Sequence, residues 1–241
     1  MRLVAFRKRL NKNQECEERL SMEMRNELYH CLLFCEMNQE KVKNILSRLN
    51  GKTKNYQKNE IVVEEKNRVD EVGILLSGEI CKVQYYSDGT EQMVQKLKRS
   101  YMVGLEIAVS LKKTSPYTMY ASLPSTVYWF PVRYIEEPGM LEEADRIFLY
   151  QRIVYFLANE DIRKYRKIEI LSSKSVREKI EKYLKIQKIR YKSNEFDIDF
   201  NREQLANYLG LNRSVLSHEL KKMEKEGLLI VRKNHFILLQ I

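Results

Sequence analysis

The sequence predicts an α+β protein in which an antiparallel β-barrel or sandwich precedes a long helix and a C-terminal winged helix-turn-helix. Three observations support this order. Residues 53–131 hold short segments rich in Val, Ile and Tyr, residues 141–168 contain no Gly or Pro, and two short amphipathic runs meet at Gly210. The chain of 241 residues is long enough for two domains that each bury a core.

Composition and charge narrow the class of protein. The chain carries a formal net charge of +10, and residues 167–241 contribute 16 Lys and Arg against 10 Asp and Glu. A basic C-terminal region suits a polyanion partner, because Lys and Arg release counterions condensed on DNA. The sequence contains no apolar run of about 18 residues, so we expect no membrane-spanning helix. The basic N-terminus has no apolar stretch long enough to predict a secretory signal. We therefore expect a cytoplasmic protein with no membrane partner, whose four cysteines stay reduced.

Turn signals divide the predicted β domain. Lys58-Asn59, Ser77-Gly78 and Asp88-Gly89 are expected to separate strands within NEIVVEE, EVGILLSGEICKVQYY, EQMVQKL and STVYWFP. Asp-Gly also suits the tight turn of a β-hairpin. Several short strands at fairly regular spacing predict an antiparallel barrel or sandwich, which could enclose a small ligand.

The segment LEEADRIFLYQRIVYFLANEDIRKYRKI predicts one long helix with two apolar faces. Two faces predict two partners, namely the β domain of the same chain and the same helix of a second subunit. The alternative is a single helix buried on both sides within one chain. The predicted dimer seam contains Ile147, Tyr150, Val154 and Leu157, and a second stripe contains Phe148, Tyr155 and Ile162.

Two further helices, on either side of Gly210, are predicted to form a helix-turn-helix. An amphipathic helix in SSKSVREKIEKYLKIQKIRY, with Ser173 or Ser175 as its N-cap, is predicted to pack against the first of them. Asn201 suits a helix start, and Gly210 suits the left-handed residue at a helix end. Asn212 is the expected N-cap of the last helix. The predicted inner faces contain Leu205, Ala206, Leu209, Leu216, Leu220 and Met223.

The exposed start of the last helix predicts contacts with base edges in a major groove. Glu219 stands where an apolar residue is more common, so we expect a narrow apolar face. The last segment, LLIVRKNHFILLQI, predicts a β-hairpin wing with Arg232 and Lys233 at its tip. The predicted base contacts are Arg213, Ser214, Ser217 and His218, and the predicted phosphate contacts are Asn201, Arg202, Asn212, Lys222 and Lys233.

This order of parts resembles the Crp/Fnr family of bacterial transcription regulators, from about Leu28 to the C-terminus. The stretches ILLSGEICKVQYYSDGTEQ, VGLEIAVSLKKTSPYTMYAS and NREQLANYLGLNRSVLSHELKKMEKEGLL carry the resemblance. The resemblance implies a β-roll of the cupin-like, double-stranded β-helix type that senses an effector, a dimerisation helix, a homodimer and a palindromic promoter site. The implied partners are double-stranded DNA, a second copy of the chain, an unknown small-molecule effector and RNA polymerase.

The predicted effector segment departs from the nucleotide-binding members of the family. Those members carry a Gly-Glu pair and, eleven residues after that Gly, an Arg followed by Ser or Thr. Here Leu105 follows Gly104, Glu106 is displaced by one residue, and Ser115-Pro116 stand in place of the Arg pair. A phosphate pocket without its Arg lacks its best bidentate donor, so we expect an effector other than cyclic AMP.

A second branch of the family implies an alternative, a redox, iron–sulfur or haem sensor. Cys16, Cys31, Cys35 and Cys81 match the number of cluster ligands but not a compact spacing, so buried thiols are the preferred interpretation. His30 is the one histidine before residue 200. The sequence accordingly predicts neither a cofactor nor a metal site.

Other classes of protein find less support. The chain has no Gly-rich phosphate loop, no G-x-S-x-G, no HExxH and no CxxC, so we expect no enzyme. A β-roll that binds only proteins remains a second alternative. The predicted division is a charged segment at 1–27, in which Met22 or Met24 is an alternative start, a β-roll at 28–139, a dimerisation helix at 140–168 and the DNA-binding domain at 169–241.

Overall fold

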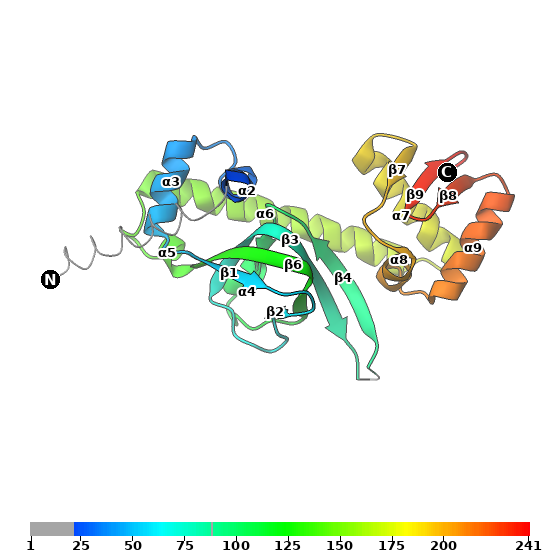
Figure 1. The fold of residues 1–241 in the computed structure, drawn as a ribbon, viewed down its shortest axis with the longest axis horizontal. Helices are drawn as coiled ribbons and strands as arrows, with labels where there is room; N and C mark the ends of the chain where they lie inside the picture. The colour runs from blue at the N-terminus through cyan, green and yellow to red at the C-terminus, as the bar shows by residue number, and fades with distance from the viewer. Residues whose placement is uncertain (1–21, 88) are drawn as a thin grey trace. The chain divides into compact units, whose positions relative to one another are not determined.

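The computed structural model describes residues 22–87 and 89–241, which form two compact units (Figure 1). The first unit contains the described residues up to Tyr85 together with Val94–Asn159. The second contains Tyr86–Met93 and Glu160–Ile241. Most of the predicted charged segment 1–27 lies outside the described residues. Among the described residues, no helix combines the length and the hydrophobicity that crossing a membrane requires.

The first unit is built around an antiparallel sheet, as the sequence predicts. Its hydrogen-bonded order is β1-β6-β3-β4, with β2 paired to β6 and β5 paired to β3 (Figure 1). Four helices of the described residues lie wholly within the same unit. The strands are β1 (Lys52–Tyr56), β2 (Ile61–Val63), β3 (Glu71–Tyr85), β4 (Glu91–Leu97), β5 (Met102–Val103) and β6 (Thr118–Pro131), and the helices are α2 (Met22–His30), α3 (Gln39–Arg48), α4 (Leu105–Ala108) and α5 (Arg133–Glu136).

The predicted turn at Ser77-Gly78 is wrong. Both residues lie inside β3, where the register with β6 shifts on either side of Ser77, so the strand continues through a bulge. Gly78 has a φ of +85°, and a Cβ there would lie 2.3 Å from the carbonyl oxygen of Pro124. The glycine therefore permits a close approach of two strands, a use of Gly that resembles a turn signal in the sequence.

The other two turn signals agree with the structure as far as it is described. Asn59 has a φ of 69°, and Gly89 has a φ of 79° between the paired residues Tyr86 and Thr90. Asp88 lies outside the described residues. Strand β1 has the sequence KTKNY and buries only Tyr56, which explains why an apolar pattern did not predict it.

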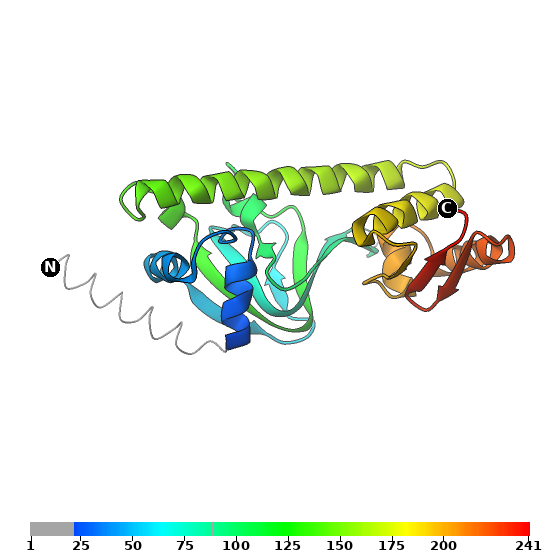
Figure 2. The same cartoon turned by 90° about the horizontal axis from the view of Figure 1, so that it is seen from above.

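The predicted long helix is confirmed as α6 (Glu143–Leu171), one uninterrupted helix in Figure 2. Its core-facing residues are Leu149, Ile153 and Phe156, which belong to neither predicted stripe. In the single chain the predicted seam is mostly exposed, and Leu157 alone packs partly against the core of its own unit. Most of the second stripe also lies outside the core, since Tyr155 and Ile162 are exposed.

The second unit contains a small sheet against three helices, around one apolar cluster. The sheet order is β7-β9-β8, and β7 is a strand that the sequence did not predict. Its elements are α7 (Val176–Tyr191), β7 (Glu195–Asp197), α8 (Arg202–Tyr208), α9 (Arg213–Lys225), β8 (Leu229–Arg232) and β9 (His235–Leu238).

Candidate nucleic-acid interface

The helix-turn-helix begins with a capping box at α8. The Asn201 side chain accepts from the Gln204 amide at 2.9 Å, and the Gln204 side chain accepts from the Asn201 amide at 3.1 Å. Helix α8 ends at Tyr208, Leu209 is its C-cap, and Gly210 follows with a φ of +62°. A residue with a Cβ is strained at this φ, so Gly210 allows the chain to turn at once into the next helix.

Helix α9 presents a polar face at its N-terminus. Asn212 is its N-cap, as expected, but the Asn212 side chain makes no capping hydrogen bond to the helix. Of the predicted base contacts, Arg213, Ser214 and His218 are exposed, whereas Ser217 is half-buried. The opposite face of α9 is fully buried, through Leu216, Leu220 and Met223.

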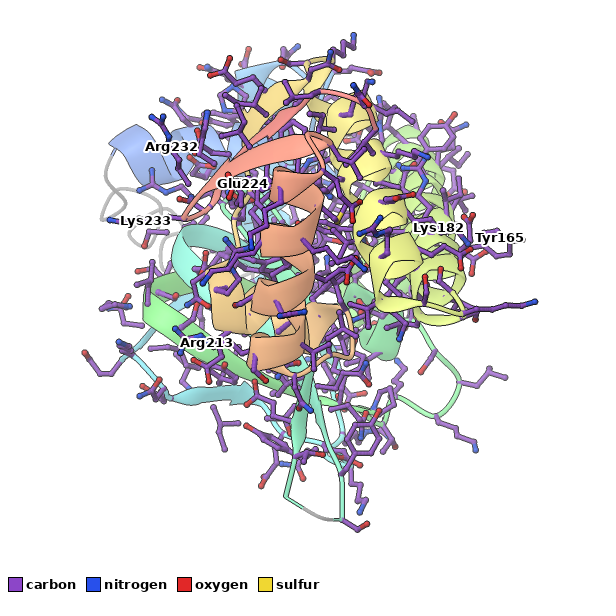
Figure 3. The ribbon with its side chains drawn as sticks, turned by 90° about the vertical axis from the view of Figure 1, so that its right-hand side faces the viewer. Tyr165, Lys182, Arg213, Glu224, Arg232 and Lys233 are labelled. Atoms are coloured by element: carbon purple, nitrogen blue, oxygen red, sulfur yellow. The ribbon has the colours of Figure 1, made fainter. Side chains whose placement is uncertain are left out.

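The predicted wing is confirmed as the β8–β9 hairpin. Arg232 pairs with His235 at its end, and Lys233 adopts a φ of 56° in the turn. Arg232 and Lys233 are exposed there, and Figure 3 shows them on the same side of α9 as each other, with Arg213 at the N-terminal end of the helix. The Glu224 carboxylate accepts from the Val231 amide at 3.1 Å, which joins α9 to the wing.

Two of the predicted phosphate contacts also hold the domain together. The half-buried Arg202 donates to the Lys233 carbonyl oxygen at 2.9 Å and lies over the Phe236 ring. Burial lowers the pKa of Arg202. Arg202 therefore fixes the wing turn to α8, while Asn201 caps that helix. The other two predicted cationic contacts, Lys222 and Lys233, are exposed.

Glu219, the unusual acidic residue of α9, pairs with a residue that the sequence analysis missed. Arg177, in the first turn of α7, donates from Nε to Glu219 at 2.7 Å. Its two Nη atoms donate to both carboxylate oxygens of Glu226, at 2.6 and 3.0 Å. The hydrogen bonds to Arg177 lower the pKa of Glu226. One guanidinium thus holds two carboxylates, Glu219 on α9 and Glu226 at the C-cap of that helix, a geometry that Lys cannot reproduce.

We expect Arg177→Gln to lower the melting temperature by roughly 2 °C, because Arg177 and Glu226 are partly exposed and solvent screens their ion pair. The folded-state pKa of Glu226 is depressed, so this stabilisation is present near neutral pH and is lost as the pH falls below 4.5, the ordinary Glu value. Thermal melts across pH measure the effect. Lys182→Gln is the control, because Lys182 pairs with Glu169 and Glu178 and not with α9; equal losses in both variants would contradict the role of Arg177.

The structure brings most of the predicted effector residues together in the first unit. Gly104, with a φ of +73°, precedes α4, whose first residue Leu105 is fully buried. Ser115 is buried and its hydroxyl donates to the Tyr117 carbonyl oxygen at 2.6 Å. Pro116 is exposed.

Glu106 lies in a buried polar cluster with two residues that the sequence analysis did not select, Lys82 and Tyr117. Lys82 donates to Glu106, the Tyr117 hydroxyl donates to the same carboxylate oxygen, and the Lys82 ammonium lies 4.4 Å from the centre of the Tyr117 ring. Burial opposes ionisation of Glu106, but the Lys82 charge and these hydrogen bonds hold its pKa below the usual value. The predicted effector segment is therefore anchored by a charge pair of the chain itself.

The cysteines of the described residues are largely enclosed. Burial raises the pKa of Cys31 to about 12 and also raises the pKa of the buried Cys81. Cys35 is half-buried and donates to the Leu32 carbonyl oxygen at 3.2 Å. Within residues 22–87 and 89–241, no three His, Cys, Asp or Glu side chains gather as metal ligands would. Cys16 lies outside these residues.

Two family models match the chain. A model of the cyclic nucleotide-binding domain matches residues 53–137, and a model of the Crp-like helix-turn-helix domain matches residues 151–241. The two matches together cover well over half of the chain, and their order is that of the two folded units. In sequence, the chain is 26% identical to the transcriptional activator protein FnrL of Cereibacter sphaeroides over 194 residues, which are 76% of this chain and 75% of FnrL.

Solved structures share the fold. FixK2 from Bradyrhizobium japonicum has a TM-score of 0.61 at 16% identity, over 78% of this chain and 92% of FixK2. The c-di-GMP responsive global regulator CLP of Xanthomonas campestris has a TM-score of 0.62 at 16% identity, over 81% of this chain and 98% of CLP.

Proposed function

Because the chain belongs to the Crp/Fnr family of transcription regulators, we propose that it binds a two-fold symmetric promoter site as a homodimer. In this proposal residues 28–139 sense a signal, residues 140–168 dimerise and residues 169–241 bind DNA. RNA polymerase is the further partner through which bound protein changes transcription. One alternative is a redox, iron–sulfur or haem sensor of the same family, for which the enclosed Cys31 and Cys81 are poor ligands. The other alternative is a module that binds only proteins, which would not need a basic wing.

The observation that carries the proposal is the polar outer face of α9. Arg213 is the first residue of this helix, and a bidentate contact from Arg to guanine O6 and N7 is worth roughly 1–3 kcal/mol of discrimination. Ser214 and His218 share the exposed face, and Ser217 lies at its edge. The base-contacting group is therefore Arg213, Ser214, Ser217 and His218.

Phosphate contacts surround that face. Exposed cations on α9 and at the wing tip can meet the DNA backbone on both sides of a groove. The residues proposed to contact phosphates are Asn201, Arg202, Asn212, Lys222 and Lys233. Among them, Arg202 acts chiefly by fixing the wing turn.

The homodimer is supported by the apolar side chains that α6 leaves exposed. Ile147, Tyr150 and Val154 recur at three- and four-residue intervals, which is the spacing of a coiled-coil seam. The stripe continues through Tyr165 and Ile168. A second copy of α6 would cover it, with Leu157 at the edge where the seam meets the chain's own core.

The effector is proposed to differ from cyclic AMP. Leu105 is buried and offers no hydrogen bond to a ribose, and Ser115 already donates to Tyr117. Glu106 is paired with Lys82. A cyclic phosphate would find no Arg at Ser115 or Pro116, and calorimetry giving micromolar affinity for cyclic AMP would contradict this part of the proposal.

Two substitutions separate base contacts from phosphate contacts. We expect Arg213→Ala to weaken binding and to relax the preference at one base pair in each half-site, by roughly 1–3 kcal/mol each. Lys233→Ala should weaken all sequences alike and reduce the salt slope by up to about two in the dimer, one per subunit. Gel shifts on matched and scrambled operators across a salt series measure both effects.

Lys182→Ala is the matched control, because Figure 3 shows Lys182 on α7, away from the wing tip and from Arg213. This variant should bind matched DNA like the unchanged protein. If Arg213→Ala keeps the full sequence preference, α9 does not contact the bases and the assignment of roles fails.

A further inference from the structure

The first unit also contains an open pocket of about 290 Å³, on the β1–β6 side of the sheet. It is lined by residues from β1, from β2 and the loop that follows it, from Glu71 at the start of β3, and from Trp129 of β6. Strands β1 and β2 both pair with β6, so these segments lie side by side (Figure 1). None of the predicted effector residues Gly104–Glu106, Ser115 and Pro116 lines it. A volume near 300 Å³ suits a compact ligand.

The floor of the pocket is aromatic. Tyr56 and Trp129 are both buried, and the Trp129 Nε1 donates to the Tyr56 hydroxyl at 3.0 Å, which links the two side chains. Burial raises the pKa of Tyr56 to about 12, with Glu60 and Glu71 contributing, so the phenol stays neutral at physiological pH. Neutral aromatic faces attract cations through their quadrupoles.

The rim carries an excess of negative charge. Arg68 and Asp70 neutralise each other through two hydrogen bonds of 2.7 and 2.9 Å. The remaining charged lining residues are Lys54, Glu64 and Glu71, two carboxylates against one ammonium.

The ammonium of Lys54 shows how a cation fits this pocket. Its Nζ lies 4.5 Å from the centre of the Tyr56 ring. Lys54 is an exposed residue on an outer strand, so the side chain can leave this position and return to water at little cost.

We propose that this pocket binds a small organic ammonium ion, which takes the place of the Lys54 ammonium over Tyr56 and is held by Glu64 and Glu71. The aromatic floor supplies cation–π attraction and the carboxylates supply charge. An anionic ligand would meet three carboxylates, and one of the two lining cations, Arg68, is already paired with Asp70. The site is independent of DNA binding, so its test neither needs nor decides the proposed regulatory function.

Trp129 provides a direct readout, because it is the only tryptophan of the chain. The full-length protein is titrated with choline up to about 10 mM while its tryptophan fluorescence is followed. We expect a saturable change with choline and none with 3,3-dimethylbutan-1-ol, its neutral isostere, since cation–π attraction requires the charge.

Two variants give opposite results if the proposal is right. Lys54→Ala removes the competing ammonium and should tighten choline binding about fivefold, whereas Glu71→Gln should weaken it by a similar factor. Equal responses to choline and its isostere, no response to choline, or weaker choline binding by Lys54→Ala would each overturn the proposal. Circular dichroism confirms that both variants fold, which is expected because both side chains are exposed.

Discussion

Replacing Lys82 by Met is expected to lower the free energy of unfolding of the first unit by roughly 3 kcal/mol, since removing one member of a buried ion pair leaves the other charge without compensation. The Lys82 side chain is only 3% exposed, and its partner Glu106 is also largely buried. The Tyr117 hydroxyl would remain the described hydrogen-bond donor to that carboxylate. Urea denaturation of the full chain, followed by circular dichroism, measures the loss.

The loss should depend on pH in a defined direction. In the unchanged protein the pKa of Glu106 is depressed, so the stability it contributes is present near neutral pH and falls as the carboxylate is protonated. Without Lys82, burial opposes the ionisation of Glu106, and only hydrogen bonds such as that from Tyr117 still favour the charged form. The pKa of Glu106 should therefore rise in the variant, so protonation relieves the variant. The difference between the two proteins therefore shrinks as the pH is lowered.

Two control variants are measured in the same way. The double variant Lys82→Met with Glu106→Leu removes both charges and should recover most of the loss. Lys113→Met removes a more exposed partner of Asp70 and Glu136, and should cost less than about 1 kcal/mol. A Lys82→Met protein no less stable than the Lys113→Met protein would contradict the structural role of the buried pair.

Replacing Val154 by Asp is expected to convert a dimer into a monomer that keeps its fold. Val154 is 60% exposed in the single chain, so the charge costs little there. In the proposed dimer the same carboxylate would be buried on both copies of α6, at several kcal/mol each. Sedimentation or light scattering at micromolar concentration measures the change. Leu157 is a less clean position, because it also packs against the core of its own unit.

Leu111→Asp is the matched control for the dimer. Leu111 is fully exposed and lies in the loop between α4 and β6, far in sequence from α6. This variant should keep the mass of the unchanged protein. An unchanged protein that is already a monomer would contradict the proposed dimer.

The order of the elements could be predicted because it rests on local patterns. The capping box at Asn201, the turn at Gly210 and the two strands around Lys233 are each specified by residues that are close in sequence. Periodicity also located α6. It did not identify the face of α6 that enters the core, because the sequence carries apolar residues around most of that helix and packing decides between the faces.

The parts of the sites that sequence reasoning missed depend on contacts between distant residues. Arg177 and Glu219 are 42 residues apart, and Lys82 and Glu106 are 24 apart. The unusual position of Glu219 on an apolar helix face was a signal that a cationic partner must exist. Lys82, in an apolar strand, was a similar signal that the sequence analysis did not use.

Footprinting of the unchanged protein on genomic DNA tests the central claim most directly. The account predicts protection of two-fold symmetric sites whose half-sites are centred about one helical turn apart, ~34 Å, with Arg213→Ala losing preference at one base pair in each half. Binding that shows no sequence preference, or protection of single half-sites without symmetry, would contradict a dimer that contacts the bases through α9.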